Sequence, residues 1–201
     1  MSQIEECVHM SDREEFNRVV EFHGCYCLDI AVGYRVAKAL LREMADEIQN
    51  MKEVFAQIGS STCAVDAIQK ITGCTLGKRN LIVSDLGKPV YILQNGRTKS
   101  AVRVYVHYWD NFDQSVLGVL KTQGKTDPEG KRRLNEYLDK QIQYILTTPE
   151  KDLFTWRRIT LDAPVTGGKF EAIPCEKCGE YVNSHFIQSI DEHPLCKECA
   201  I

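Results

Sequence analysis

Four cysteines close the chain in two Cys-x-x-Cys pairs. Cys175 and Cys178 form the first pair, Cys196 and Cys199 form the second, and 17 residues separate the pairs. Four thiolates at this spacing can surround one tetrahedral Zn²⁺, because each pair supplies two neighbouring corners and the segment between them is long enough to fold back. Gly179 follows the first pair and allows a tight turn. The sequence therefore predicts a zinc module with a filled ligand shell and a structural role.

A second group of candidate ligands lies near the N-terminus. His23, Cys25 and Cys27 fall within five residues, just before a long predicted helix. A helix N-terminus carries about half a positive charge, which lowers the pKa of a nearby thiol. Thiolates here would be good ligands for a soft metal ion and good nucleophiles.

Two further cysteines flank the next predicted helix. Cys63 begins it and Cys74 follows it, and Asp66 lies one turn after Cys63. Spacing alone leaves two alternatives open, a core metal or redox site that joins these groups to the first cluster, or a set of separate buried thiols. The catalytic candidates are Asp66, as a proton acceptor, and Cys25.

The elements that would position these residues predict an α+β fold. Apolar residues recur at helical spacing from Cys27 to about Asn50 and from Arg133 to Leu146, with a loop expected at Pro128-Glu-Gly130. Runs rich in β-branched residues with a period of two predict strands at 53–58, 81–83, 90–93, 101–106 and 154–159. Gly87 and Gly96 punctuate these runs and predict hairpins. We therefore expect long helices packed on an antiparallel or mixed sheet.

Two domains are expected from the distribution of these patterns. The α+β core should cover residues 1–165, and a small zinc finger with four cysteine ligands should cover residues 170–201, with a linker at 162–168. The finger is typical of a treble clef or a zinc ribbon. Two residues follow Cys199, which leaves little room for the helix of a full treble clef.

Composition limits the classes of function. The chain has 201 residues, of which 43% are hydrophobic and 26% are charged, as in a globular protein. We expect no membrane association and a cytoplasmic location, because no apolar run approaches the ~20 residues of a membrane span and the acidic N-terminal segment does not resemble a signal peptide. A net charge of −3 argues against nucleic-acid binding.

Two sequence blocks carry a resemblance to a known family. The run Phe22-His-Gly-Cys-Tyr-Cys27, followed by Leu-Asp and a helix containing Gly33-Tyr-Arg35, resembles the opening signature of FmdE, a component of molybdenum/tungsten formylmethanofuran dehydrogenase. The run Cys63-Ala-Val-Asp-Ala-Ile-Gln69, followed by Gly73-Cys-Thr-Leu-Gly-Lys78, resembles a second block of that family. The finger is similar to a C-terminal extension of many members.

The resemblance implies an α+β core, a homodimer, and a site built from His23, Cys27 and Cys63, with Cys74 and Asp66 nearby. The chain also departs from the family signature at two places. Cys25 stands where the signature has its second histidine, and Leu28-Asp29 replaces Pro-Gly. A change from histidine to cysteine makes a site softer and favours thiophilic metals.

Two functional hypotheses follow. The first is a metal-binding accessory protein that handles a metal or cofactor for molybdenum or tungsten redox enzymes. It would hold a structural Zn²⁺ in the finger and a second Zn²⁺ or another soft ion in the core, and its finger would dock a protein partner. The alternative is a metal-dependent enzyme whose Cys/His core site activates water or a small substrate. A ligand group beside a substrate-sized pocket would favour the enzyme, and ligands at an exposed edge would favour metal delivery.

Overall fold

The computed structural model describes residues 12–162 and 171–201, apart from the side chains of Asn111 and His185. The chain divides into two compact units, residues 1–164 and residues 165–201, and each is described by itself. Most of the predicted linker at 162–168 lies outside the described residues. Among the described helices, none has the length and apolarity that crossing a bilayer would require.

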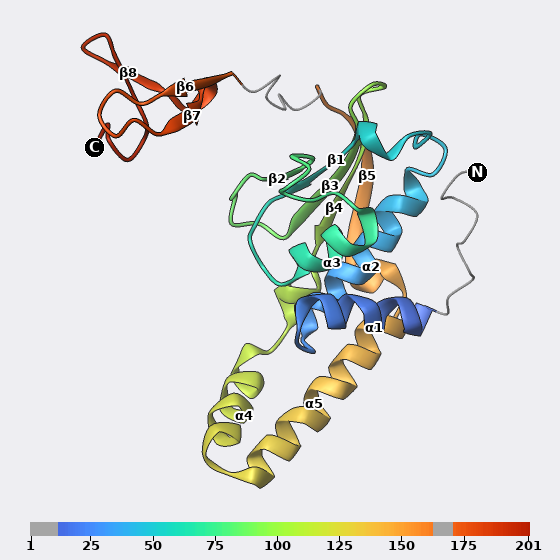
Figure 1. The fold of residues 1–201 in the computed structure, drawn as a ribbon. Coiled ribbons are helices and arrows are strands. Elements are labelled where there is room, and N and C mark those ends of the chain that lie inside the picture. Colours follow the sequence, from blue (N-terminus) through green and yellow to red (C-terminus); the bar gives the residue numbers. More distant parts are fainter. Residues whose placement is uncertain (1–11, 163–170) are drawn as a thin grey trace. The chain divides into compact units, whose positions relative to one another are not determined.

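Three helices lie against one face of the core sheet (Figure 1). They are α1 (Asp12–His23), α2 (Leu28–Glu43) and α3 (Ala64–Thr72). Helix α2 contacts β3 and β4, α3 contacts β1, and α1 packs on both helices. The apolar stripe predicted for the long helix is buried at Ile30, Ala37 and Met44, whereas Leu41 is only partly buried and its neighbour Leu40 is fully buried.

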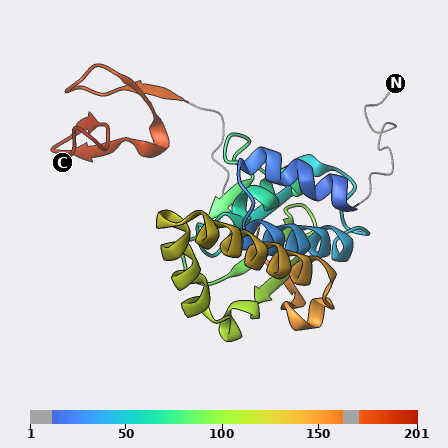
Figure 2. The same ribbon diagram turned by 90° about the horizontal axis from the view of Figure 1, so that it is seen from below.

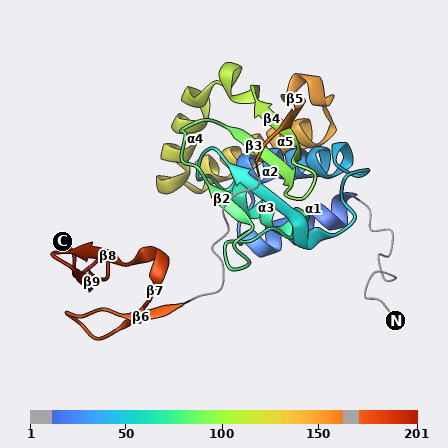
Figure 3. The ribbon, with the colours of Figure 1, turned by 90° about the horizontal axis from the view of Figure 1, so that it is seen from above.

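The core sheet is mixed and has five strands in the order β2-β1-β3-β4-β5, which Figure 3 shows from above. The strands are β1 (Val54–Ile58), β2 (Leu81–Val83), β3 (Val90–Asn95), β4 (Ser100–Val106) and β5 (Phe154–Thr160). Strand β2 is parallel to β1, and the other neighbours are antiparallel. The predicted hairpin at Gly96 joins β3 to β4, but the hairpin predicted at Gly87 is wrong. The strands on either side of Gly87 are β2 and β3, and β1 lies between them in the sheet, so they do not pair. Helix α3 carries the chain from β1 to β2, and such a crossover leaves these two strands parallel.

A helical hairpin is inserted between β4 and β5. It consists of α4 (Gln114–Thr126) and α5 (Pro128–Thr147), which pack on each other and extend away from the sheet (Figures 1 and 2). The loop predicted at Pro128 is wrong, because Asp127 caps the helix there by accepting from the backbone N–H groups of Glu129 and Gly130. Proline fits the first helical position, where its missing N–H has no partner to lose.

The small unit is built from two antiparallel hairpins. Strand β6 (Ala172–Pro174) pairs with β7 (Tyr181–Asn183), and β8 (Gln188–Ile190) pairs with β9 (His193–Leu195). The first cysteine pair lies in the turn of the first hairpin, and the second pair follows β9 in a run of turns. This arrangement agrees with the expectation of a small cysteine-rich module that ends without a helix.

Candidate metal sites and an adjoining pocket

The four C-terminal cysteines converge. Their sulfurs all lie within 4.8 Å of one another. In the first turn the N–H of Gly179 donates to the carbonyl of Cys175 at 2.8 Å, and Gly179 has a φ of +75°, which favours glycine. In the second turn the N–H of Cys199 donates to the carbonyl of Cys196 at 3.1 Å. The N–H of Cys196 also donates to the sulfur of Cys175 at 3.3 Å and so connects the two turns.

The electrostatics of these sulfurs fit a cation between them. Backbone N–H groups of Cys196 and Cys178 lower the pKa of the Cys175 thiol to about 6. The neighbouring Cys196 thiol, more than any other group, raises the pKa of Cys199 to about 12, because several thiolates cannot share so small a space uncompensated. A divalent ion would remove this conflict, and four sulfurs are the donor set that zinc prefers. The nearby His193 is exposed and bonds to Glu176 at 2.5 Å.

The core cluster begins where α1 ends. His23 is the last residue of α1, and Gly24, with a φ of +86°, turns the chain toward α2. The ligand atoms of His23, Cys25 and Cys27 lie within 4.8 Å of one another, and the His23 Nε2 to Cys27 Sγ distance is 4.0 Å. Cys25 is exposed and Cys27 is half-buried. The three residues predicted from the sequence as a group therefore do come together.

Asp66 fixes the orientation of the histidine. Its Oδ2 lies 2.7 Å from Nδ1 of His23, and its Oδ1 accepts from Nε2 of Gln69 at 3.2 Å. A carboxylate on Nδ1 leaves Nε2 directed at the sulfurs, which is the arrangement by which proteins orient a metal-bound histidine. In the structure Asp66 therefore positions the His23 ring, whereas the sequence predicted Asp66 as a proton acceptor.

Cys63 joins this group through the packing of two helices. Cys27 and Cys63 precede α2 and α3 as their N-terminal flanking residues. A Cβ on Gly33 of α2 would lie 2.7 Å from Cα of Ala64, so only glycine lets the start of α3 approach α2 this closely. The approach brings the Cys63 thiol near enough to Cys27 to raise the pKa of the Cys27 thiol, although Cys63 is not among the residues whose ligand atoms lie within 4.8 Å of one another.

Burial dominates the chemistry of Cys27. It raises the pKa of this thiol to about 12, the backbone N–H of Ile30 opposes the shift, and Cys63 adds to it. The lowered pKa predicted from the helix N-terminus is therefore wrong for Cys27, because desolvation outweighs the helix dipole here. Without a cation Cys27 is a protonated thiol and a weak nucleophile.

Cys74 lies apart from the cluster. It is fully buried after the end of α3, and its thiol donates to the carbonyl of Val54 in β1 at 3.6 Å. Gly73 ends α3 in the left-handed conformation, with a φ of +69°, and turns the chain toward the sheet. The structure therefore does not support Cys74 as a member of the core site, although the sequence included it as a candidate.

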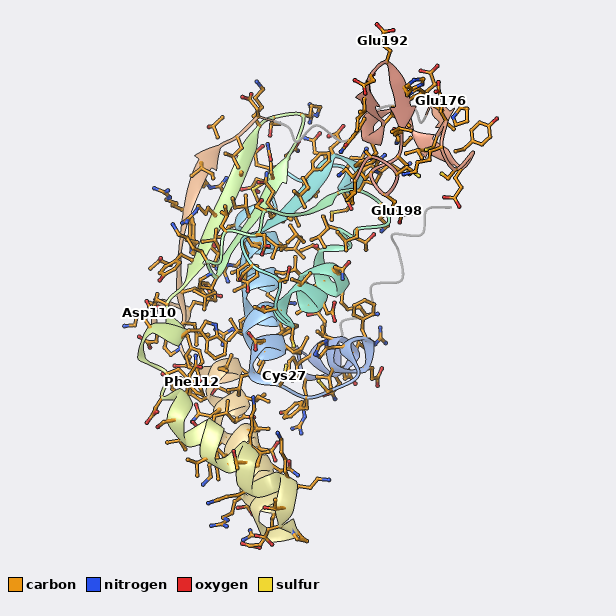
Figure 4. The ribbon with its side chains drawn as sticks, turned by 90° about the vertical axis from the view of Figure 1, so that its left-hand side faces the viewer. Cys27, Asp110, Phe112, Glu176, Glu192 and Glu198 are labelled. Atoms are coloured by element: carbon orange, nitrogen blue, oxygen red, sulfur yellow. The ribbon has the colours of Figure 1, made fainter. Side chains whose placement is uncertain are left out.

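A cavity of about 520 Å³ opens beside Cys27. It lies between the start of α2, strand β3 and the α4–α5 hairpin. Figure 4 shows Cys27 at the N-terminal start of α2 and Phe112 where the chain enters α4. Aromatic and aliphatic side chains form most of its wall, and Asp29 and Lys121 are its charged residues. Sequence reasoning missed this cavity, because α4 was not predicted.

The two sequence blocks that stood out now have structural reasons. Gly33 allows the start of α3 to pack closely against α2. The Tyr34 hydroxyl donates to Glu15 at 3.0 Å and so connects α2 to α1, and Arg35 donates to the carbonyls of Ile145 and Thr148 at 2.7 and 3.0 Å and so anchors α5. The signature therefore assembles the helices around the cluster of His23, Cys25, Cys27 and Cys63.

Comparison with known families agrees with this assembly. Residues 22–155, which contain both blocks, match the sequence model of the family described as FmdE, molybdenum formylmethanofuran dehydrogenase operon. The chain belongs to the FmdE family. The matched region contains the core cluster and the adjoining cavity, and it ends within β5, before the finger.

Two relatives of this FmdE chain extend the comparison. A protein of Archaeoglobus fulgidus named "Probable S-adenosyl-L-methionine-binding protein" is 28% identical over an alignment of 193 positions, which covers 91% of this chain and 51% of that protein. The chain thus spans about half the length of this curated relative. A crystal structure of a tungsten formylmethanofuran dehydrogenase FmdE-like protein from Syntrophus aciditrophicus has a TM-score of 0.60 and 20% identity, and covers 96% of this chain and 93% of that one. At this identity the structural likeness shows the shared fold.

Proposed function

We propose that the FmdE core is a metal-handling centre. His23, Cys25 and Cys27 hold one soft divalent ion such as Zn²⁺, and Cys63 supplies a further sulfur. The protein then acts as an accessory that handles a metal or cofactor for molybdenum or tungsten redox enzymes. The observation that carries the proposal is the convergence of three ligand atoms within 4.8 Å around a histidine whose other nitrogen is fixed by Asp66.

Exposure favours the accessory role. Cys25 is open to solvent, so an ion bound to it can be reached by the ligands of another protein. Two or three sulfurs and one imidazole are donors for zinc and other thiophilic ions. A bound ion would also hold Cys27 as a thiolate against the effect of burial.

Metal analysis of purified protein variants tests this proposal. The full chain should carry two zinc ions, Cys27→Ser should carry one and Cys178→Ser should carry one, because each substitution empties one of the two sites. Cys74→Ala is the matched control and should carry two, since Cys74 lies apart from the cluster. If Cys27→Ser carries as much zinc as the unchanged protein, the core is not a metal centre.

The finger is proposed to dock a protein partner with a basic surface. Its described residues carry six carboxylates against two lysines; the carboxylates are Glu171, Glu176, Glu180, Asp191, Glu192 and Glu198. Three of them are labelled in Figure 4. Tyr181 and Phe186 are exposed in the same unit, at 74% and 46%. An acidic surface with exposed aromatic residues fits a basic protein better than a nucleic acid.

A metal-dependent enzyme is the second candidate, and the cavity favours it. Cys27 contributes to the wall of a cavity whose volume is typical of small-molecule sites. An ion with an open coordination position there would act as a Lewis acid or lower the pKa of a bound water. Zinc-dependent turnover of a small molecule that Cys27→Ser abolishes would support the enzyme, whereas zinc transfer to a partner without turnover would support the accessory role.

A further inference from the structure

The cavity beside Cys27 has the dimensions of a site for an organic molecule. Its volume of about 520 Å³ lies within the usual range for small-molecule pockets, and a single metal ion would fill only a small part of it. Four aromatic side chains line it, namely Tyr26, Tyr91, Trp109 and Phe112. They come from the start of α2, from β3 and from the segment that leads into α4, so the folded core brings them together.

The aromatic walls are held in place by the fold. Tyr91 is 2% exposed, so the surrounding core holds its ring in place. Trp109 and Phe112 pack edge to face, with ring centroids 5.5 Å apart. Tyr26 lies at the opening and is 43% exposed. Three rings in fixed packing and one at the mouth form a preorganised surface for a flat or alkylated group.

One carboxylate gives the cavity its charge preference. Asp29 lines the wall in the first turn of α2 and is partly removed from water. Lys121 of α4 is the positive residue of the cavity wall and acts on this carboxylate, but the two form no ion pair among the described residues. Lys121 is exposed on α4 and can turn toward solvent. A positive ligand group would gain a partner at Asp29, whereas a negative group would meet repulsion there.

We propose that this cavity binds a small organic cation that carries an apolar ring, with its alkylated ammonium group held by Asp29 and the aromatic faces. Aromatic rings attract such cations through their negative faces, and a nearby carboxylate adds direct charge pairing. The apolar ring occupies the leucine-lined remainder of the cavity. The inference goes beyond the metal-handling role, because the residues that recognise the cation are not metal ligands.

A pair of probes of opposite charge tests the proposal on the full chain. Phenyltrimethylammonium and benzenesulfonate both carry one phenyl ring and a compact charged group. Isothermal titration at fixed ionic strength should give an affinity for phenyltrimethylammonium at least about tenfold above that for benzenesulfonate. No binding of the cation, or equal or tighter binding of the sulfonate, overturns the proposal.

Matched variants locate the binding. Asp29→Asn and Trp109→Leu should each weaken binding of phenyltrimethylammonium by about tenfold. Asp46→Asn, at an exposed aspartate beyond the other end of α2, and Trp156→Leu, at an exposed tryptophan of β5, should leave it unchanged. Lys121→Gln removes a competing cation and should tighten binding, which keeps the proposal testable if Asp29→Asn does not fold. Loss of binding in the control variants, or none in the cavity variants, contradicts the assignment.

Zinc content is measured in every sample of this series. Probe binding that persists in Cys63→Ser without core zinc supports the cation site independently of the metal centre. Zinc binding with no preference for the cation overturns the cation site and leaves the metal centre standing. The two proposals therefore fail separately.

Discussion

His23 has a neighbour at each ring nitrogen, which is the arrangement expected of a metal-binding histidine. Asp66 contacts Nδ1 at 2.7 Å, while Nε2 faces the sulfur of Cys27. Asp66 is itself held by Gln69, which lies one turn later on α3. The second sequence block thus supports a residue of the first block, and this explains why Cys63, Asp66 and Gln69 occur at helical spacing.

Asp66→Asn should weaken metal binding at the core without removing any ligand. An amide cannot supply the negative charge that polarises the imidazole, and loss of such a partner typically lowers metal affinity by about 10- to 100-fold. Competition with a chelator of known zinc affinity measures the change, and the finger zinc in the same sample serves as an internal reference.

Asp46→Asn is the control for this substitution, because Asp46 is exposed and lies beyond the end of α2. It should leave both zinc affinities as they are. Equal core affinities for Asp66→Asn and the unchanged protein would show that Asp66 does not orient a ligand.

At the scale of elements, periodicity predicted the elements that are buried on the core side. Helices α2 and α3 and the strands β1, β3, β4 and β5 were all expected, because their apolar residues follow the period of the element, although α2 ends at Glu43 and not near Asn50. Helix α4 was not expected. None of its residues is buried, so its sequence shows only a weak apolar stripe. The predicted position of Cys74 was wrong for a different reason. Sequence spacing does not reveal the direction that the chain takes after Gly73.

The contact between α2 and α3 decides whether the two halves of the core site meet, and Gly33 is its narrowest point. Gly33→Ala should destabilise the protein by about 1–3 kcal/mol, because the new methyl group would overlap the backbone of Ala64. Chemical denaturation measures this change. The substitution should also reduce core zinc, since Cys63 would be displaced from Cys27.

Gly118→Ala provides a matched comparison on α4. A Cβ at Gly118 would meet nothing within 4 Å, so the higher helix propensity of alanine should stabilise the protein by up to about 1 kcal/mol. If the two substitutions have the same effect on stability, close helix packing at Gly33 is not what requires glycine there.

For the whole molecule, the two units should depend on metal differently. The finger has short strands, and Cys175 and Cys196 are the buried apolar side chains of its described residues, so we expect its fold to depend on a bound metal. Cys178→Ser should release the finger zinc and make residues after about 173 sensitive to protease, while the core remains resistant. Mass spectrometry of the proteolytic fragments measures this. A fully protected C-terminal segment in this variant would contradict a metal-dependent finger.

The α4–α5 hairpin exposes apolar side chains along α4. Val116 and Val119 of α4 are 41% and 56% exposed, and no residue of α4 is buried. The inner face of α4 lines the cavity through Leu117 and Lys121, so its outer valines remain for another surface. A second copy of the chain is the occupant that we expect, because the family resemblance implies a homodimer and a two-fold axis would bring the two outer valine faces together.

Val119→Asp should therefore shift the protein from dimer to monomer, because a buried carboxylate without a partner would oppose association. Sedimentation velocity over a range of concentrations measures the oligomeric state. Val83→Asp, at a valine of β2 that is 37% exposed, introduces the same charge away from the hairpin and should leave the dimer intact. A monomeric unchanged protein at all concentrations would contradict the dimer, and a dimer that Val119→Asp leaves intact would place its interface elsewhere.

Since α4 also forms one wall of the cavity, a dimer built on its outer face would hold that wall in position. Val119→Asp should then also weaken binding of phenyltrimethylammonium.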